Sequence, residues 1–108
     1  MTPLITNLEK LLASGKDTAL LRFGLGNAYL DAGEAEPAVI HLRRAIELKA
    51  DYSAAWKLLG KALADSGDAE AAKAAYRSGI ETATAKGDKQ AVKEMTVFLR
   101  RLERPAPP

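Results

Sequence analysis

The two halves of this sequence repeat each other at a fixed spacing. Gly26 and Gly60 lie 34 residues apart, and the same shift pairs Asp17 with Asp51. Further identities at this shift are Leu25/Leu59, Ala28/Ala62, Asp31/Asp65, Gly33/Gly67, Ala35/Ala69, Glu36/Glu70, Ala38/Ala72, Arg43/Arg77, Ile46/Ile80 and Glu47/Glu81. A period of this length indicates an array of structural units, each of which hides its apolar face only by stacking on its neighbours.

Short turns divide the chain into six segments. Four of them place an acid closely after a glycine, at 15–17, 33–34, 67–68 and 87–88. Glycine tolerates the left-handed conformation that ends a helix, and an acid favours the start of the next one. A fifth break at 50–53 lacks the glycine but keeps an acid, Asp51, that we expect to cap. We therefore predict helices over 3–14, 18–32, 35–49, 52–66, 69–85 and 89–103, and no strand, because no segment alternates polar and apolar residues.

Gly26 and Gly60 fall inside predicted helices, where glycine costs roughly 1 kcal/mol relative to alanine. Trp56 lies one turn before Gly60 on the same side of the helix. We interpret the two glycines as places where a neighbouring helix approaches closely, while Trp56 fills wider space nearby. The cost in helix propensity is then offset by buried apolar surface, at about 25 cal/mol per Å². Small residues that complete the close contact are Ala38, Ala45, Ala72 and Gly79.

The repeat resembles the tetratricopeptide repeat (TPR), whose unit reads W-x2-L-G-x2-Y, then A-x3-F, then P. The second copy matches at Trp56, Leu59, Gly60, Leu63, Ala72 and Tyr76. The first copy matches at Leu25, Gly26, Tyr29, Ala38 and Leu42. Arg22 replaces the tryptophan there, and Ala50 and Thr84 replace the closing prolines, so the turns after the second helices are less sharply fixed than in the family.

The resemblance implies an all-α fold, a right-handed α-solenoid of six helices in a single domain over 1–104. We expect a leading half-repeat helix at 3–14, repeats at 17–50 and 51–84, a capping helix at 88–103 and a disordered tail at 105–108. The first segment places Leu4, Leu8, Leu11 and Leu12 opposite Ala38, Leu42, Ala45 and Ile46. The last segment carries one apolar stripe at helical spacing: Ala91, Val92, Met95, Phe98, Leu99 and Leu102.

In TPR proteins the first helix of each pair lines a concave groove that often holds a peptide. The resemblance therefore implies a non-catalytic protein–protein interaction module, binding a peptide or helix of a partner protein. The groove residues we expect are Leu20, Phe23, Asn27, Leu30, Tyr52, Lys57 and Lys61. Their apolar and cationic halves predict a partner segment with apolar anchors and acidic groups. The alternative is that Leu20 and Phe23 pack under the first helix and that the lysines are ordinary solvated charge.

Several other functions find no support in the sequence. The absence of cysteine excludes disulfides and thiolate chemistry. We see no signal peptide and no run approaching the ~18 apolar residues of a membrane span. We expect a cytoplasmic protein that is not an enzyme and has no cofactor, metal or small-molecule substrate. His41, the only histidine, lacks a second ligand or base, and we expect it to be exposed.

A second class of function stays open. The last helix and its flanks are basic, and could make the protein a nucleic-acid or anionic-membrane adaptor. A net charge of only +2 with interleaved signs instead favours a solvated capping face. A homo-oligomer formed through an uncovered solenoid end is a further alternative. We exclude clamping of a chaperone's C-terminal carboxylate, because of the positions that perform it in the family only Asn27 matches, the others being Phe23, Leu58, Asp88 and Val92.

Overall fold

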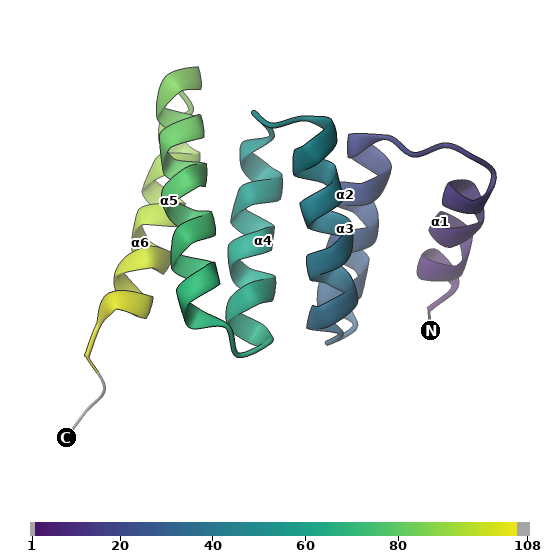
Figure 1. The fold of residues 1–108 in the computed structure, drawn as a ribbon, viewed down its shortest axis with the longest axis horizontal. Coiled ribbons are helices and arrows are strands. Elements are labelled where there is room, and N and C mark those ends of the chain that lie inside the picture. The colour runs from purple at the N-terminus through teal and green to yellow at the C-terminus, as the bar shows by residue number, and fades with distance from the viewer. Residues whose placement is uncertain (1, 106–108) are drawn as a thin grey trace.

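The computed structural model describes residues 2–105 and contains six α-helices stacked side by side (Figure 1). They are α1 (Pro3–Ala13), α2 (Ala19–Asp31), α3 (Ala35–Leu48), α4 (Ser53–Asp65), α5 (Ala69–Lys86) and α6 (Lys89–Glu103). The predicted boundaries agree with these to within one residue, and residues 2–105 contain no strand. The prediction of an all-α helical repeat solenoid is confirmed. The predicted disordered tail lies outside the described residues, except for Pro105.

The helix ends follow the predicted turn chemistry only in part. Gly15, Gly33, Gly67 and Gly87 all have positive φ, as their turns require. Asp68 and Asp88 cap α5 and α6 through backbone N–H groups two or three residues into each helix. The predicted cap at Asp51 is wrong: Tyr52 precedes α4 without a side-chain cap, and Asp51 pairs with Lys49 at 3.3 Å.

Consecutive helices pack against each other along the whole stack, from α1 to α6. In addition, α4 contacts both α2 and α6, so these three helices form one layer, with α3 and α5 on its other side. The stack is elongated, measuring 47 × 34 × 18 Å. The complete pairs α2/α3 and α4/α5 occupy the middle, and α1 and α6 stand at the two ends (Figure 1).

Three glycines mark the closest approaches between helices. A Cβ atom added to Gly26 would lie 2.6 Å from Cδ2 of Leu42 on α3, and one added to Gly60 would lie 2.6 Å from Cζ of Tyr76 on α5. At Gly79 it would lie 2.5 Å from Sδ of Met95 and 2.8 Å from Cβ of Trp56. No real Cβ contact is this short, so the interpretation of Gly26 and Gly60 as close-approach sites is confirmed.

Two apolar clusters form the core. The larger lies among α1 to α5 and includes the fully buried Ile5, Leu25 and Leu42. The smaller joins α5 and α6 around Met95. Trp56 packs against both clusters, and its indole N–H donates to the carbonyl of Ala50 at 2.9 Å. The apolar stripe predicted for α6 therefore faces the stack.

We expect Gly60→Ala to lower the free energy of unfolding by about 1–3 kcal/mol, because the added methyl must displace the rigid ring of Tyr76. Gly24→Ala is the matched control. A Cβ there would meet only Cδ1 of Leu8, at an ordinary 3.9 Å, so the better helix propensity of alanine should stabilise by up to about 1 kcal/mol. Urea denaturation followed by circular dichroism measures both. Equal stabilisation by the two substitutions would contradict the close-approach interpretation.

Candidate functional site

The predicted groove residues lie on α2, on α4 and in the turn before α4. The structure brings together Phe23 and Tyr52, whose rings stack with centroids 5.0 Å apart and tie α2 to the start of α4. Leu20 is 72% exposed, so α1 does not cover it. Phe23 and Leu30 are half-buried against the larger core cluster, and Asn27 is exposed. Part of the apolar half is therefore packing, and Leu20 beside the stacked rings is its accessible portion.

The two lysines of the groove are paired within the protein. Nζ of Lys57 lies 3.0 Å from Oε1 of Glu94 on α6, and Nζ of Lys61 lies 3.9 Å from Oδ2 of Asp65, one turn away. The hydrogen bond from Lys57, with a smaller contribution from Gln90, lowers the pKa of Glu94. These pairs are substantially exposed and so contribute little to stability. An acidic group of a partner can therefore exchange for Glu94 or Asp65 at small cost.

Shallow hollows follow the seam between α4 and α6. One is lined by Ser53, Ala54, Lys57, Asp88, Gln90, Ala91 and Glu94. The next has a floor that includes Ala64, Tyr76, Phe98 and Leu102, with Lys61, Asp65 and Arg101 also lining it. The α4 residues of both hollows form one stripe at helical spacing, so the hollows make a continuous seam. Burial, aided by the charge of Asp65, raises the pKa of Tyr76 to about 12, so its hydroxyl stays protonated.

Sequence reasoning missed the α6 side of this seam. Glu94, Phe98 and Arg101 all contribute to it, and the Arg101 guanidinium lies 5.6 Å from the centroid of the Phe98 ring. The prediction treated the stripe of α6 as purely internal and its charges as purely external. A helical-wheel comparison of α6 with α4 would have indicated that some residues of each kind lie at the boundary.

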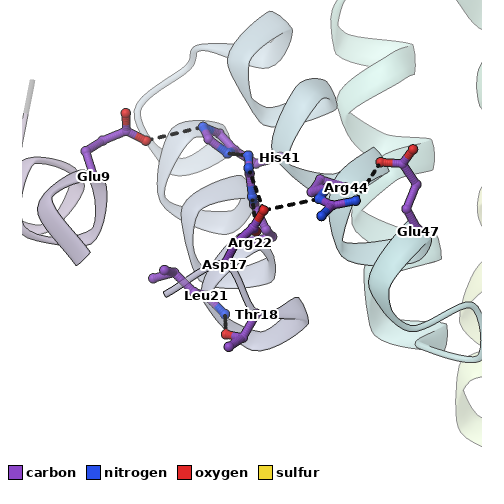
Figure 2. A network of polar contacts seen from close by, with 8 residues as sticks. All are labelled: Glu9, Asp17, Thr18, Leu21, Arg22, His41, Arg44 and Glu47. Carbon is purple, nitrogen blue, oxygen red and sulfur yellow. Dashed lines mark hydrogen bonds and ion pairs between the residues drawn. The ribbon is translucent and has the colours of Figure 1, made fainter. Parts of the chain in front are cut away.

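A second polar cluster joins α1, α2 and α3 (Figure 2). Nε and Nη2 of Arg22 bind the two carboxylate oxygens of Asp17 at 2.7 and 3.2 Å, and Nε of Arg44 lies 3.2 Å from Oδ2 of the same residue. These contacts, with the hydrogen bond from Arg22 first, lower the pKa of Asp17 to about 2. Asp17 is thus an ion-pair centre, and the neighbouring Thr18 caps α2.

The prediction of an exposed His41 is wrong. His41 is only 8% exposed, and its ring stacks on Tyr29 with centroids 5.5 Å apart. Its Nδ1 lies 3.0 Å from Nη1 of Arg22, which is always a donor, so Nδ1 must accept and the proton sits on Nε2. Nε2 lies 3.3 Å from Oε1 of Glu9 on α1 (Figure 2). The physical reason is Arg22: standing where the repeat has tryptophan, it brings a polar group inward, and His41 satisfies it.

This cluster has the character of a structural joint. Its histidine is neutral and both faces of the ring system are occupied, so it offers no free base. Among the described residues, no group of three or more histidine, cysteine, aspartate or glutamate side chains is arranged to hold a metal ion. Nor does any helix within 2–105 have the length and apolar character needed to cross a membrane. The α2/α4/α6 face is therefore the better candidate site.

The paired glycines, the stacked helix pairs and the groove layer are all features of one repeat family. The family described as the tetratricopeptide repeat matches this chain at residues 19–52 and 53–86. The chain belongs to the TPR family. TPR repeats are generally protein–protein interaction modules.

Individual TPR relatives resemble nearly the whole chain. The TPR repeat-containing protein PA0015 of Pseudomonas aeruginosa is 59% identical over 101 residues, covering 94% of this chain and 96% of the relative. The solution structure of protein BPP2914 from Bordetella parapertussis superposes with a TM-score of 0.83 at 46% identity, over 96% of this chain and 90% of the other. The Sgt2 TPR domain from Aspergillus fumigatus gives 0.74 at 26% identity, over 96% and 71%.

We expect stability to fall as the pH is lowered from 7.5 to 5.5. Burial lowers the pKa of folded His41 below 6.5, so the unfolded chain binds more protons across this range and gains stability relative to the fold. His41 is the only histidine, which makes the attribution direct. Urea denaturation at both pH values measures the effect, and His41→Gln should flatten it. An unchanged pH dependence in that variant would contradict the assignment.

Proposed function

We propose that this TPR domain binds an extended or helical segment of a partner protein on the face formed by α2, α4 and α6. The single observation that supports the proposal most is the exposed Leu20 next to the stacked Phe23 and Tyr52. A leucine that is 72% exposed beside two aromatic rings gives an anchor site for an apolar side chain. The seam between α4 and α6 continues that surface with a mixed apolar and charged lining.

The charges of this face favour a partner that carries acidic groups beside its apolar anchor. Lys57 and Lys61 can release Glu94 and Asp65 and pair with the partner's carboxylates instead. Such an exchange keeps every charge paired, so it contributes more to specificity than to affinity. Asn27, exposed between the two halves, can hydrogen-bond the partner's backbone. The proposed function is non-catalytic.

In this proposal residues 1–104 act as one TPR domain, with a half-repeat helix at 3–14, repeats at 17–50 and 51–84, and a capping helix at 88–103. We place it in the cytoplasm, since a chain with no cysteine suits a reducing compartment. The rival function, a nucleic-acid or membrane adaptor using α6, is weakened by pairing among the charges of that region: Arg77 binds Glu103 at 3.0 Å and Lys86 binds the carbonyl of Asp51.

We expect Leu20→Asp and the triple variant Phe23→Ala/Lys57→Glu/Lys61→Glu to lose a partner that the wild type captures from its native cell. The matched control is Ile40→Asp, which places the same charge at a leucine-like residue 65% exposed on α3, outside the groove layer. With the partner purified, calorimetry should show at least roughly tenfold weaker binding for the groove variants, as for a hot-spot residue. Identical captures by all variants would reject the groove. Binding to nucleic acid that falls steeply with salt would favour the rival.

A further inference from the structure

The two ends of the stack are complementary halves of one repeat. The chain holds two complete helix pairs, α2/α3 and α4/α5, preceded by α1 and followed by α6 (Figure 1). A shift of 34 residues places Leu4, Leu8 and Leu11 of α1 on Ala38, Leu42 and Ala45, so α1 is a second helix without a first. At the other end, α6 follows a second helix and is a first helix without a second.

The position of α6 in the repeat confirms its type. Its first residue, Lys89, lies 36 residues after Ser53, the first residue of α4, because α5 has 18 residues where α3 has 14. At this spacing Met95 corresponds to Leu59, and the two are 0% and 2% exposed. Thr96 then corresponds to Gly60, the residue of α4 that meets Tyr76 of its partner helix.

The outer face of α1 is apolar and uncovered. Leu4 is 57% and Leu11 43% exposed, although their counterparts Ala38 and Ala45 are completely buried within the α2/α3 pair. The two leucines are seven residues apart, two turns along one side of the helix. The opposite side of α1 anchors it to the stack, since Ile5 is fully buried.

The outer face of α6 is only half-buried where α4 is fully covered. Val92, Thr96 and Leu99 correspond to Trp56, Gly60 and Leu63, of which the last two are buried in the α4/α5 pair. Thr96 carries a side chain where α4 has none, so a helix docked here would lie slightly farther out than α5 does from α4. A hollow lined in part by Ala83, Thr84 and Val92 opens beside this face.

The charges of the two ends complement each other. In both complete repeats, an acid just before the first helix pairs with a base of the second helix: Asp17 with Arg44 at 3.2 Å, and Asp51 with Lys86 at 3.9 Å. Lys10 of α1 lies 34 residues before Arg44, and Asp88 directly precedes α6. Within residues 2–105 neither Lys10 nor Asp88 has an ion-pair partner. Each end therefore holds one half of a pair that the intact repeats complete.

We propose that copies of this chain associate head to tail, with α1 of one copy docking on α6 of the next. The contact would complete a third helix pair, bury Leu4 and Leu11, and bring Lys10 of one copy to Asp88 of the other. A second copy fits because it continues an interface that the chain already forms twice within itself. The contact joins two different surfaces, so it produces an open row or a closed ring.

The test uses two purified variants, each blocked at one end. Leu11→Glu charges the N-terminal face at an exposed residue, and Thr96→Arg charges the C-terminal face at a half-exposed one. Sedimentation velocity across a concentration range gives the mass. Wild type should grow in mass with concentration, each variant alone should be monomeric, and an equal mixture should form a dimer and nothing larger, because only one good interface remains per pair. Ile40→Glu, exposed but at neither end, should behave as wild type.

Other outcomes would overturn the proposal. A wild type that stays monomeric at every concentration rejects it, and so does dimerisation of either blocked variant alone, which indicates a symmetric contact. Circular dichroism checks that the variants fold. If Thr96→Arg does not fold, Asp88→Asn provides a second C-terminal variant, since asparagine keeps the helix cap but removes the charge. Asp88→Asn and Lys10→Gln should each weaken association by roughly two- to fivefold, the range of an exposed ion pair. No weakening in either would also reject the predicted contact.

Discussion

The close approach of helices at three glycines determines the spacing of the whole stack. Gly26, Gly60 and Gly79 each leave no room for even one carbon atom between neighbouring helices. Because the contacts repeat from one pair to the next, the geometry of each pair is transmitted along the chain. The groove layer of α2, α4 and α6 is a consequence: its helices are held at a distance where side chains of adjacent first helices, such as Phe23 and Tyr52, can touch.

The first repeat solves its packing differently from the second. Where the second repeat has Trp56, the first has Arg22, and a buried polar cluster replaces a buried aromatic ring. Polar groups away from water must be paired, and here Asp17, His41 and Arg44 supply the partners. The same cluster reaches Glu9, so it also fastens the end helix α1. One substitution thus changed the chemistry of a joint while leaving the backbone repeat intact.

The sequence predicted the backbone well because glycines, caps and periodicity act locally. Helix boundaries, the role of Gly60 and the inward stripe of α6 follow from spacing alone. The burial of His41 was not predictable in this way, since it depends on Arg22, which is 19 residues away in the chain. The pairing of Lys57 with Glu94 was missed for a similar reason. It connects two helices whose relative rotation depends on the length of α5, and that length departs from the repeat.

The four extra residues of α5 limit how this architecture can grow. Extending the array by copying a 34-residue block after α4 in strict period would set Lys93 and Glu94 where Leu59 and Gly60 lie, directing charge into the contact between helices. A recombination junction that preserves the apolar contacts must instead fall 36 residues on. The long helix therefore acts as a punctuation mark in evolution, separating the portion of the chain that can be multiplied from the portion that closes it.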